Sequence, residues 1–293
     1  MGGLTKPFGW TGARVPVIGQ GTWHMGESRR RGEREAAALR LGLDLGLTHI
    51  DTAEMYGRGG AEEVVAAAIR GRRRSDLFLV SKVLPENASY HGTIRAAEQS
   101  LRRLQTDYLD LYLLHWRGRY PLAETMAAME TLVAGGKIRF IGVSNFDVAG
   151  VREAMAALAR ERLACNQVLY HLGSRGIELE LIPFCQRERI AVVGYTPYGN
   201  FPQRRWTVPF SRRDCPPHDV LREIGCDHGG TARQVCLAFL TRNPGVFAIP
   251  KASDPAHVRE NAGAAALELT PAEIEAIDAA FPTPPHPVPL EMG

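Results

Sequence analysis

The sequence predicts a closed (β/α)8 barrel with a short N-terminal hairpin and a long loop after the seventh strand. Short runs of apolar, β-branched residues alternate with longer amphipathic stretches along the whole chain. The runs recur at intervals close to the ~30 residues of one βαβ unit. The 293-residue length fits such a barrel with an insertion. A Gly-rich GxGxxG turn is absent from the sequence, which counts against an open doubly wound sheet.

Eight of these runs are expected to form the strands of the barrel. In chain order they are residues 18–22, 48–52, 77–82, 109–115, 138–143, 164–168, 190–195 and 246–250. We expect one barrel domain over residues 1–293, in which residues 1–18 carry the hairpin. The proline-rich tail, residues 281–293, should lie extended on the surface, and whether it touches the pocket rim stays open.

Helices are expected between the strands. Leu122, Met126, Met129 and Val133 repeat at helical spacing, and a Gly-Gly pair follows them as a stop signal. Later helices begin with capping signals, namely TARQ, DP and TPAE at positions 231–234, 254–255 and 270–273.

The gap before the eighth strand is longer than the others and holds an insertion, residues 199–228, rich in Pro and Arg. An insertion after the seventh strand lies on the face where barrel active sites form. Its arginines are expected to belong to a solvated loop, and the alternatives are a lid over a bound ligand or the attraction of an acidic substrate. They are Arg204, Arg205, Arg212 and Arg213.

Composition and charge narrow the functional class. Lys and Arg total 35 against 32 Asp and Glu, and the basic residues are scattered along the chain, which argues against nucleic-acid or membrane-surface binding. The five cysteines have no zinc-binding or redox spacing, so we expect reduced thiols and no metal. With no signal-peptide core and no long apolar run, we expect a cytoplasmic monomer.

Side chains able to do chemistry are concentrated at the carboxyl ends of the expected strands, where barrel active sites lie. The amino ends show no comparable set. In chain order these residues are Trp23, Asp51, Lys82, His115, Ser144, Asn145, Gln167, Tyr195 and Lys251.

Asp51 and Lys82 end adjacent strands and could form an ion pair, which by itself is more often structural than functional. Tyr56 follows in a glycine-containing loop, where a tyrosine often packs on the surface. Beside an ammonium, however, phenolate is favoured, and we expect the phenol pKa to fall from its usual ~10. A phenol tuned in this way can protonate an alkoxide, and His115 could orient the substrate oxygen.

The remaining strand ends suit a dinucleotide. Ser144, Asn145 and Gln167 offer hydroxyl and amide groups for a carboxamide, and Tyr195 offers a face on which an aromatic ring can stack. Lys251 stands just before a helix start, a favourable place for a phosphate. Ordinary capping or packing explains each residue alone, but their joint order favours a nicotinamide cofactor.

The chain resembles the aldo-keto reductase family, specifically a bacterial-type member, almost from end to end. The resemblance rests on an ordered series of segments: HIDTAEMYG, FLVSK, DLYLLHW, IGVSNF, NQVLYH, VGYTPYG and IPKASDPAHVRENA. It implies hydride transfer from NADP(H) to aldehydes or ketones without a metal. Tyr56 would be the general acid/base, tuned by Lys82 and Asp51, and His115 would orient the carbonyl.

The resemblance also implies two sets of binding residues. The substrate pocket would be lined by Trp23, Tyr56, His115 and Trp116. The cofactor would be bound by Thr22, Trp23, Asp51, Ser144, Asn145, Gln167, Tyr195, Thr196, Pro197, Tyr198, Gly199, Asn200, Lys251, Ala252, Ser253, His257, Glu260 and Asn261. Within this set, the resemblance implies that residues 196–200 would cover the pyrophosphate and that residues 251–261 would bind the adenosine end.

Two positions depart from the pattern of many members. Ala252 stands where they have serine, and His257 stands where they place an arginine near the adenosine phosphate. Histidine is mostly neutral at pH 7. We therefore expect NADP(H), bound chiefly through Lys251, with NAD(H) tolerated more than usual.

Two other functions fit the same residues. One is a redox-sensing regulatory barrel that binds NADP(H) without turnover. The other is a Schiff-base lyase with Lys82 as the covalent nucleophile.

Overall fold

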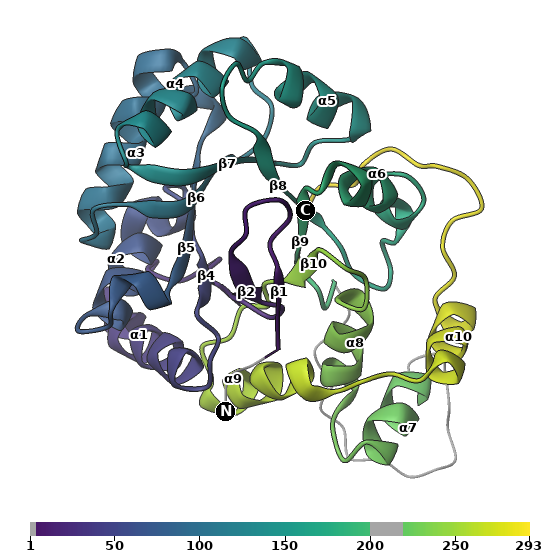
Figure 1. Ribbon diagram of the computed structural model, residues 1–293. Coiled ribbons are helices and arrows are strands. Elements are labelled where there is room, and N and C mark those ends of the chain that lie inside the picture. Colours follow the sequence, from purple (N-terminus) through teal and green to yellow (C-terminus); the bar gives the residue numbers. More distant parts are fainter. Residues whose placement is uncertain (1–3, 200–218) are drawn as a thin grey trace.

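The barrel is built from eight parallel strands whose order in the sheet follows the chain (Figure 1). A computed structural model describes residues 4–199 and 219–293. Parallel bridges from Ile18 to Ala248 and from Gly21 to Lys251 join the first strand to the last and close the sheet. The predicted fold class is confirmed. The strands are β3 (Gln20–Gly21), β4 (His49–Asp51), β5 (Phe78–Val83), β6 (Leu109–Leu114), β7 (Ile138–Ser144), β8 (Leu163–Leu169), β9 (Ala191–Tyr195) and β10 (Val246–Ala248).

The expected N-terminal hairpin is present, and it covers the amino ends of the strands. Strands β1 (Thr5–Pro7) and β2 (Arg14–Pro16) pair antiparallel, and Figure 1 shows them across the centre of the barrel. Phe8 follows β1 and packs against Phe78 and Phe247, with ring centroids 4.9 and 5.0 Å away. These rings close one end of the barrel.

Helices surround the sheet and bury its outer face (Figure 1). Both expected capping boxes form, at Thr231 and Thr270, and Asp254 caps the helix after β10. No helix in the described ranges is long and apolar enough to cross a membrane. The helices are α1 (Arg29–Asp44), α2 (Gly60–Ile69), α3 (Tyr90–Leu104), α4 (Leu122–Ala134), α5 (Val148–Ala156), α6 (Leu181–Glu188), α7 (Asp219–Asp227), α8 (Ala232–Leu240), α9 (Pro255–Gly263) and α10 (Pro271–Ala280).

The expected loop at 199–228 is wrong in its last part, because residues 219–227 form helix α7. Leu221 and Ile224 repeat at helical spacing and are buried, which supplies the apolar face that the sequence reading overlooked. The rest of this insertion, including Asn200 and the four arginines from Arg204 to Arg213, lies outside the described residues.

Alternation along the strands places polar side chains above the apolar core inside the barrel. On β5, Phe78 and Val80 lie in the interior cluster and Lys82 follows two residues later on the same face. Leu111 and Leu113 likewise precede His115. Because alternate residues face the interior, several strands place a polar side chain at their carboxyl ends, above the apolar layers that fill the barrel. We call this end of the barrel the mouth.

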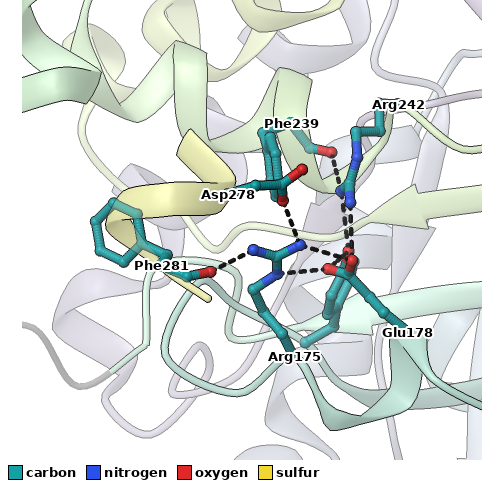
Figure 2. A network of polar contacts seen from close by, with 7 residues as sticks. Arg175, Glu178, Phe239, Arg242, Asp278 and Phe281 are labelled. Atoms are coloured by element: carbon teal, nitrogen blue, oxygen red, sulfur yellow. Dashed lines mark hydrogen bonds and ion pairs between the residues drawn. The ribbon is translucent and has the colours of Figure 1, made fainter. Parts of the chain in front are cut away.

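The tail after α10 is fixed near its start by a buried arginine. Figure 2 shows Arg175, from the loop after β8, contacting Glu178, Asp278 and the carbonyl oxygen of Phe281. Arg242 also reaches Glu178, at 2.8 Å. This network anchors the end of α10, and the tail then runs without helix or strand, as expected, to the mouth of the barrel.

Candidate active site

Lys82 is fully buried near the end of β5, and its ammonium has three acceptors. Nζ donates to Asp51 Oδ2 at 2.7 Å, to the Thr52 carbonyl oxygen at 3.0 Å and to Tyr56 Oη at 3.2 Å. An ammonium has three N–H bonds, so this environment satisfies all of them. The sequence prediction that an aspartate, a lysine and a tyrosine converge at one rim is confirmed.

Asp51 ties this cluster to the other side of the barrel. Its Oδ2 accepts from Lys82, and its Oδ1 accepts from Gln167 Nε2 at 2.7 Å. A buried carboxylate needs both charge and hydrogen-bond partners, and here it has them. Gln167 thus orients Asp51, a contact that sequence reasoning did not include.

Tyr56 reaches the cluster from the turn after β4, where a 3-10 helix spans Tyr56–Gly59. The turn packs closely on the segment after β3. Gly57 has φ +56°, and a Cβ there would lie 2.8 Å from the Met25 carbonyl oxygen. Glycine is therefore required on both counts, and the close approach holds the phenol over Lys82.

The pKa of Tyr56 moves opposite to the sequence prediction. Burial raises it above the usual value for tyrosine, and this outweighs the lowering effect of Lys82, while Asp51 raises it further. Burial also works to lower the pKa of Lys82, but Asp51 and Tyr56 together raise it. The resting pair at neutral pH is therefore a neutral phenol beside a charged ammonium.

His115 directly follows β6 and lines the same mouth. Burial, with a further contribution from Lys82, lowers its pKa to about 2, so the imidazole is neutral at physiological pH. Its ring lies 5.7 Å from the Tyr56 ring, centroid to centroid. Nδ1 is buried and has no hydrogen-bond partner among the described residues. A neutral imidazole can donate one N–H to a ligand oxygen.

These groups open into a cavity of about 380 Å³ at the carboxyl ends of the strands. Trp23, Tyr56, His115 and Trp116, the four residues predicted for the substrate pocket, all line it. Other predicted residues on its wall are Thr22, Asp51, Ser144, Asn145, Gln167, Tyr195, Thr196, Pro197, Tyr198, Gly199 and Lys251.

The polar groups expected to hold a carboxamide are linked to each other. Ser144 Oγ donates to the Gln167 carbonyl oxygen at 2.8 Å, and Asn145 Nδ2 donates to Ser144 Oγ at 3.2 Å. Asn145 Oδ1 accepts from Tyr195 Oη at 2.8 Å. This hydrogen-bonded row fixes the amide groups and the Tyr195 ring on one wall.

The predicted adenosine end lies along α9, beyond the cavity wall. Lys251 Nζ donates to Ser253 Oγ at 3.1 Å, so the two polar groups lie side by side. Tyr198 Oη donates to Asn261 Oδ1 at 2.6 Å. His257 is exposed, and neither it nor Ala252, Ser253, Glu260 and Asn261 lines the cavity.

Six residues that line the cavity were not predicted from the sequence: Gly21, Met55, Arg233, Ile249, Met292 and Gly293. Met55 precedes Tyr56, so its neighbour was a usable signal. The tail residues are placed by the anchor at Arg175 and by the Gly293 N–H, which donates to Tyr195 Oη at 3.2 Å. The open question about the tail is thereby answered: it does touch the rim.

Comparisons with known proteins agree with this geometry. Residues 17–281 match the model of the aldo/keto reductase family. The chain is 49% identical over 278 residues to methylglyoxal reductase YeaE of Escherichia coli, covering 95% of each chain. It is 34% identical to glyoxal reductase of Bacillus subtilis, over 92% of this chain and 90% of the other.

Solved structures give the same answer. An aldo-keto reductase from Klebsiella pneumoniae, crystallised in complex with NADPH, is 48% identical, with a TM-score of 0.90 and full coverage of both chains. The fold and the mouth define a barrel oxidoreductase that acts on carbonyl groups, which confirms the predicted enzyme class. This chain belongs to the aldo/keto reductase family.

Proposed function

We propose that the protein is an NADP(H)-dependent reductase of aldehydes and ketones in which Tyr56 donates the proton. The observation that carries this proposal is the direction of one hydrogen bond. Lys82 Nζ donates to the phenol oxygen at 3.2 Å, so the phenol's own O–H hydrogen must point elsewhere. Because Tyr56 lines the cavity, a carbonyl oxygen placed there can accept that hydrogen.

The cluster favours proton donation in two ways. The pKa of Tyr56 is raised, so the phenol stays protonated at neutral pH and can act as an acid. Once the proton has left, the phenolate oxygen already has the Lys82 ammonium as a partner. Asp51 holds that ammonium charged and in place, and His115, neutral at this pH, can donate its N–H to the same substrate oxygen.

The wall opposite Tyr56 fits a nicotinamide cofactor. Gln167 donates through Nε2 to Asp51, and no described residue donates to its Oε1, which can accept from a carboxamide N–H. Tyr195 is fixed by Asn145 and offers its ring for stacking. NADPH, which the Klebsiella pneumoniae relative binds, would supply the hydride when bound. Lys251 and Ser253 would hold its 2′-phosphate.

The substrate class follows from the pocket and from the relatives. Trp23 and Trp116 give the cavity aromatic walls, and Trp23 is exposed whereas Tyr56 and His115 are buried. Two relatives are named for reduction of methylglyoxal and glyoxal. Small 2-oxoaldehydes are therefore the first substrates to test among aldehydes and ketones.

The Schiff-base alternative is not supported by the environment of Lys82. A nucleophilic amine must be neutral, whereas this ammonium has a carboxylate at 2.7 Å and a raised pKa. Its three N–H bonds are all engaged, and the side chain is fully buried.

The test is Tyr56→Phe, which removes the phenol oxygen and keeps the ring. We expect kcat for methylglyoxal reduction to fall by about 10²- to 10⁴-fold, the usual contribution of a general acid. The affinity for NADPH, measured by quenching of tryptophan fluorescence, should stay within about twofold because the cavity walls are intact.

Tyr120→Phe is the matched control. Tyr120 lies in the loop after β6, outside the cavity, and its Oη accepts a hydrogen bond from Arg119 Nη2 at 3.2 Å. It should reduce substrate at the wild-type rate. Near-normal turnover by Tyr56→Phe would show that another group donates the proton. Tight NADPH binding by the wild type without turnover of any carbonyl would favour the regulatory alternative.

A further inference from the structure

Besides Lys251, one other cationic side chain among the described residues, Arg233, lines the cavity. Among the described lining residues, only Lys251 and Arg233 carry a charge that stays positive at neutral pH. Arg233 lies in the first turn of α8, on the same wall as residues 196–199. A dinucleotide brings a two-phosphate bridge in addition to any 2′-phosphate, so one lysine alone leaves much of its charge without a partner.

The guanidinium of Arg233 is held in a fixed orientation. Its central carbon lies 3.7 Å from the centroid of the Tyr198 ring, and its Nε lies 3.1 Å from Glu260 Oε2. The side chain is 13% exposed. Stacking on Tyr198 and pairing with Glu260 fix the plane of the guanidinium, whose terminal nitrogens carry N–H bonds in the fork geometry that suits phosphate oxygens.

The segment under Arg233 is fixed as well. Cys236 Sγ contacts the Pro197 carbonyl oxygen at 3.5 Å, and Tyr198 Oη donates to Asn261 at 2.6 Å. Helices α8 and α9 therefore hold Pro197 and Tyr198, two of the residues that the family resemblance assigns to the cofactor's pyrophosphate. Arg233 lies against that segment through the Tyr198 ring and pairs with Glu260 of α9.

We infer that Arg233 binds the diphosphate bridge of the dinucleotide, an inference that rests on the proposed function. Glu260 acts through Arg233 as a positioning residue, because its carboxylate fixes the plane of the guanidinium.

NADPH and NADH both contain the diphosphate bridge, so the inference can be tested by comparing the two dinucleotides. Arg233→Gln should raise the Kd of NADPH and of NADH by a similar factor, about tenfold or more. Calorimetric titration of the full chain measures both values without turnover. Lys251→Gln is the contrast, since loss of a 2′-phosphate contact should weaken NADPH much more than NADH.

Salt dependence separates phosphate binding from adenine stacking. The only phosphates of NADH are in the bridge, so the Kd of NADH should rise with NaCl less steeply in Arg233→Gln than in the wild type. Arg233→Lys keeps a cation and should restore part of the affinity. Arg40→Gln, a loss of charge on the exposed face of α1, should leave both Kd values unchanged.

Three results would overturn the inference. They are a Kd of NADH within twofold of wild type in Arg233→Gln, a loss confined to NADPH, and a weakened Kd with an unchanged salt slope. Thermal melting identifies a variant that has simply unfolded, and Arg233→Lys then supplies the measurement. If the wild type binds neither dinucleotide, the proposed function fails instead.

Discussion

The two ends of the barrel bury their interior groups in opposite ways. At the hairpin end, Phe8 packs on Phe78 and Phe247, and the nearby imidazole of His49 has no hydrogen bond to any described residue. At the mouth, Lys82 is just as deeply buried, yet all of its N–H bonds have acceptors. A buried group without polar partners has to stay neutral, whereas a charge can persist where its partners are built in.

His49 and His115 allow the two ends to be compared through side chains of the same kind. Burial lowers the pKa of His49 to about 3 and that of His115 to about 2, with Lys82 contributing in both cases. His49 is enclosed by aromatic rings, while His115 lines the cavity. The same neutral imidazole is thus inert at one end and available to a ligand at the other.

The largest effect is expected at the mouth, from Lys82→Met. Loss of the ammonium removes the partner of the phenolate and should lower kcat by about 10²- to 10⁴-fold. It also leaves Asp51 as an unpaired buried carboxylate, which should reduce the free energy of unfolding by about 3–5 kcal/mol. Urea denaturation and steady-state kinetics measure the two consequences separately.

The double variant Asp51→Asn with Lys82→Met distinguishes the effect of Lys82 on stability from its effect on the reaction rate. Removing both charges should recover much of the stability lost in Lys82→Met but none of the rate. If turnover returned with stability, Lys82 would be acting only through the fold.

The hairpin end should respond to Phe8→Ala in stability alone. Truncating a fully buried ring leaves a cavity and should cost about 3–5 kcal/mol in the free energy of unfolding. At a temperature where the variant remains folded, kcat/KM should match the wild type. Leu4→Ala, at a side chain that is 53% exposed, is the control and should change neither quantity. A drop in kcat/KM comparable to that of Lys82→Met would mean the two ends are coupled.

The smallest expected effect is a change in acid sensitivity. An unfolded histidine has a pKa of ~6.5, whereas His49 in the fold stays neutral down to about pH 3. Between these values the unfolded state binds the extra proton, so stability falls as the pH drops. One histidine contributes about 1.4 kcal/mol per pH unit.

His49→Gln should therefore flatten the acid side of the stability profile by that amount, measured by urea denaturation between pH 6 and pH 4. His115→Gln should flatten it similarly, because its folded pKa is also far below 6.5. A slope unchanged from wild type would show that His49 is protonated in the folded state.

The features predicted from the sequence were those set by local patterns, namely the strand ends and the helix caps. Position at the carboxyl ends of the expected strands predicted that Lys82 and His115 reach the mouth of the barrel, and the capping boxes at Thr231 and Thr270 predicted two helix starts. The direction of the Tyr56 pKa was wrong because it depends on burial, which is created by the segment after β3 packing over the turn.

Arg233 was missed for a similar reason. It occupies the first turn of a capped helix, where a basic residue is usually solvated, and its partners Tyr198 and Glu260 are distant in the chain. The tail residues at the rim depended on the Arg175 anchor, another contact without a local pattern.

The seam between Gly21 and Lys251 has a consequence for biosynthesis. Asp51, Tyr56, Lys82 and His115 all leave the ribosome well before residue 251, yet the cylinder cannot close without it. Until then the nascent ion pair stays hydrated, and the apolar strands beside it are exposed to chaperones. These four side chains are thus synthesised first, and the strand that closes the cylinder around them comes last.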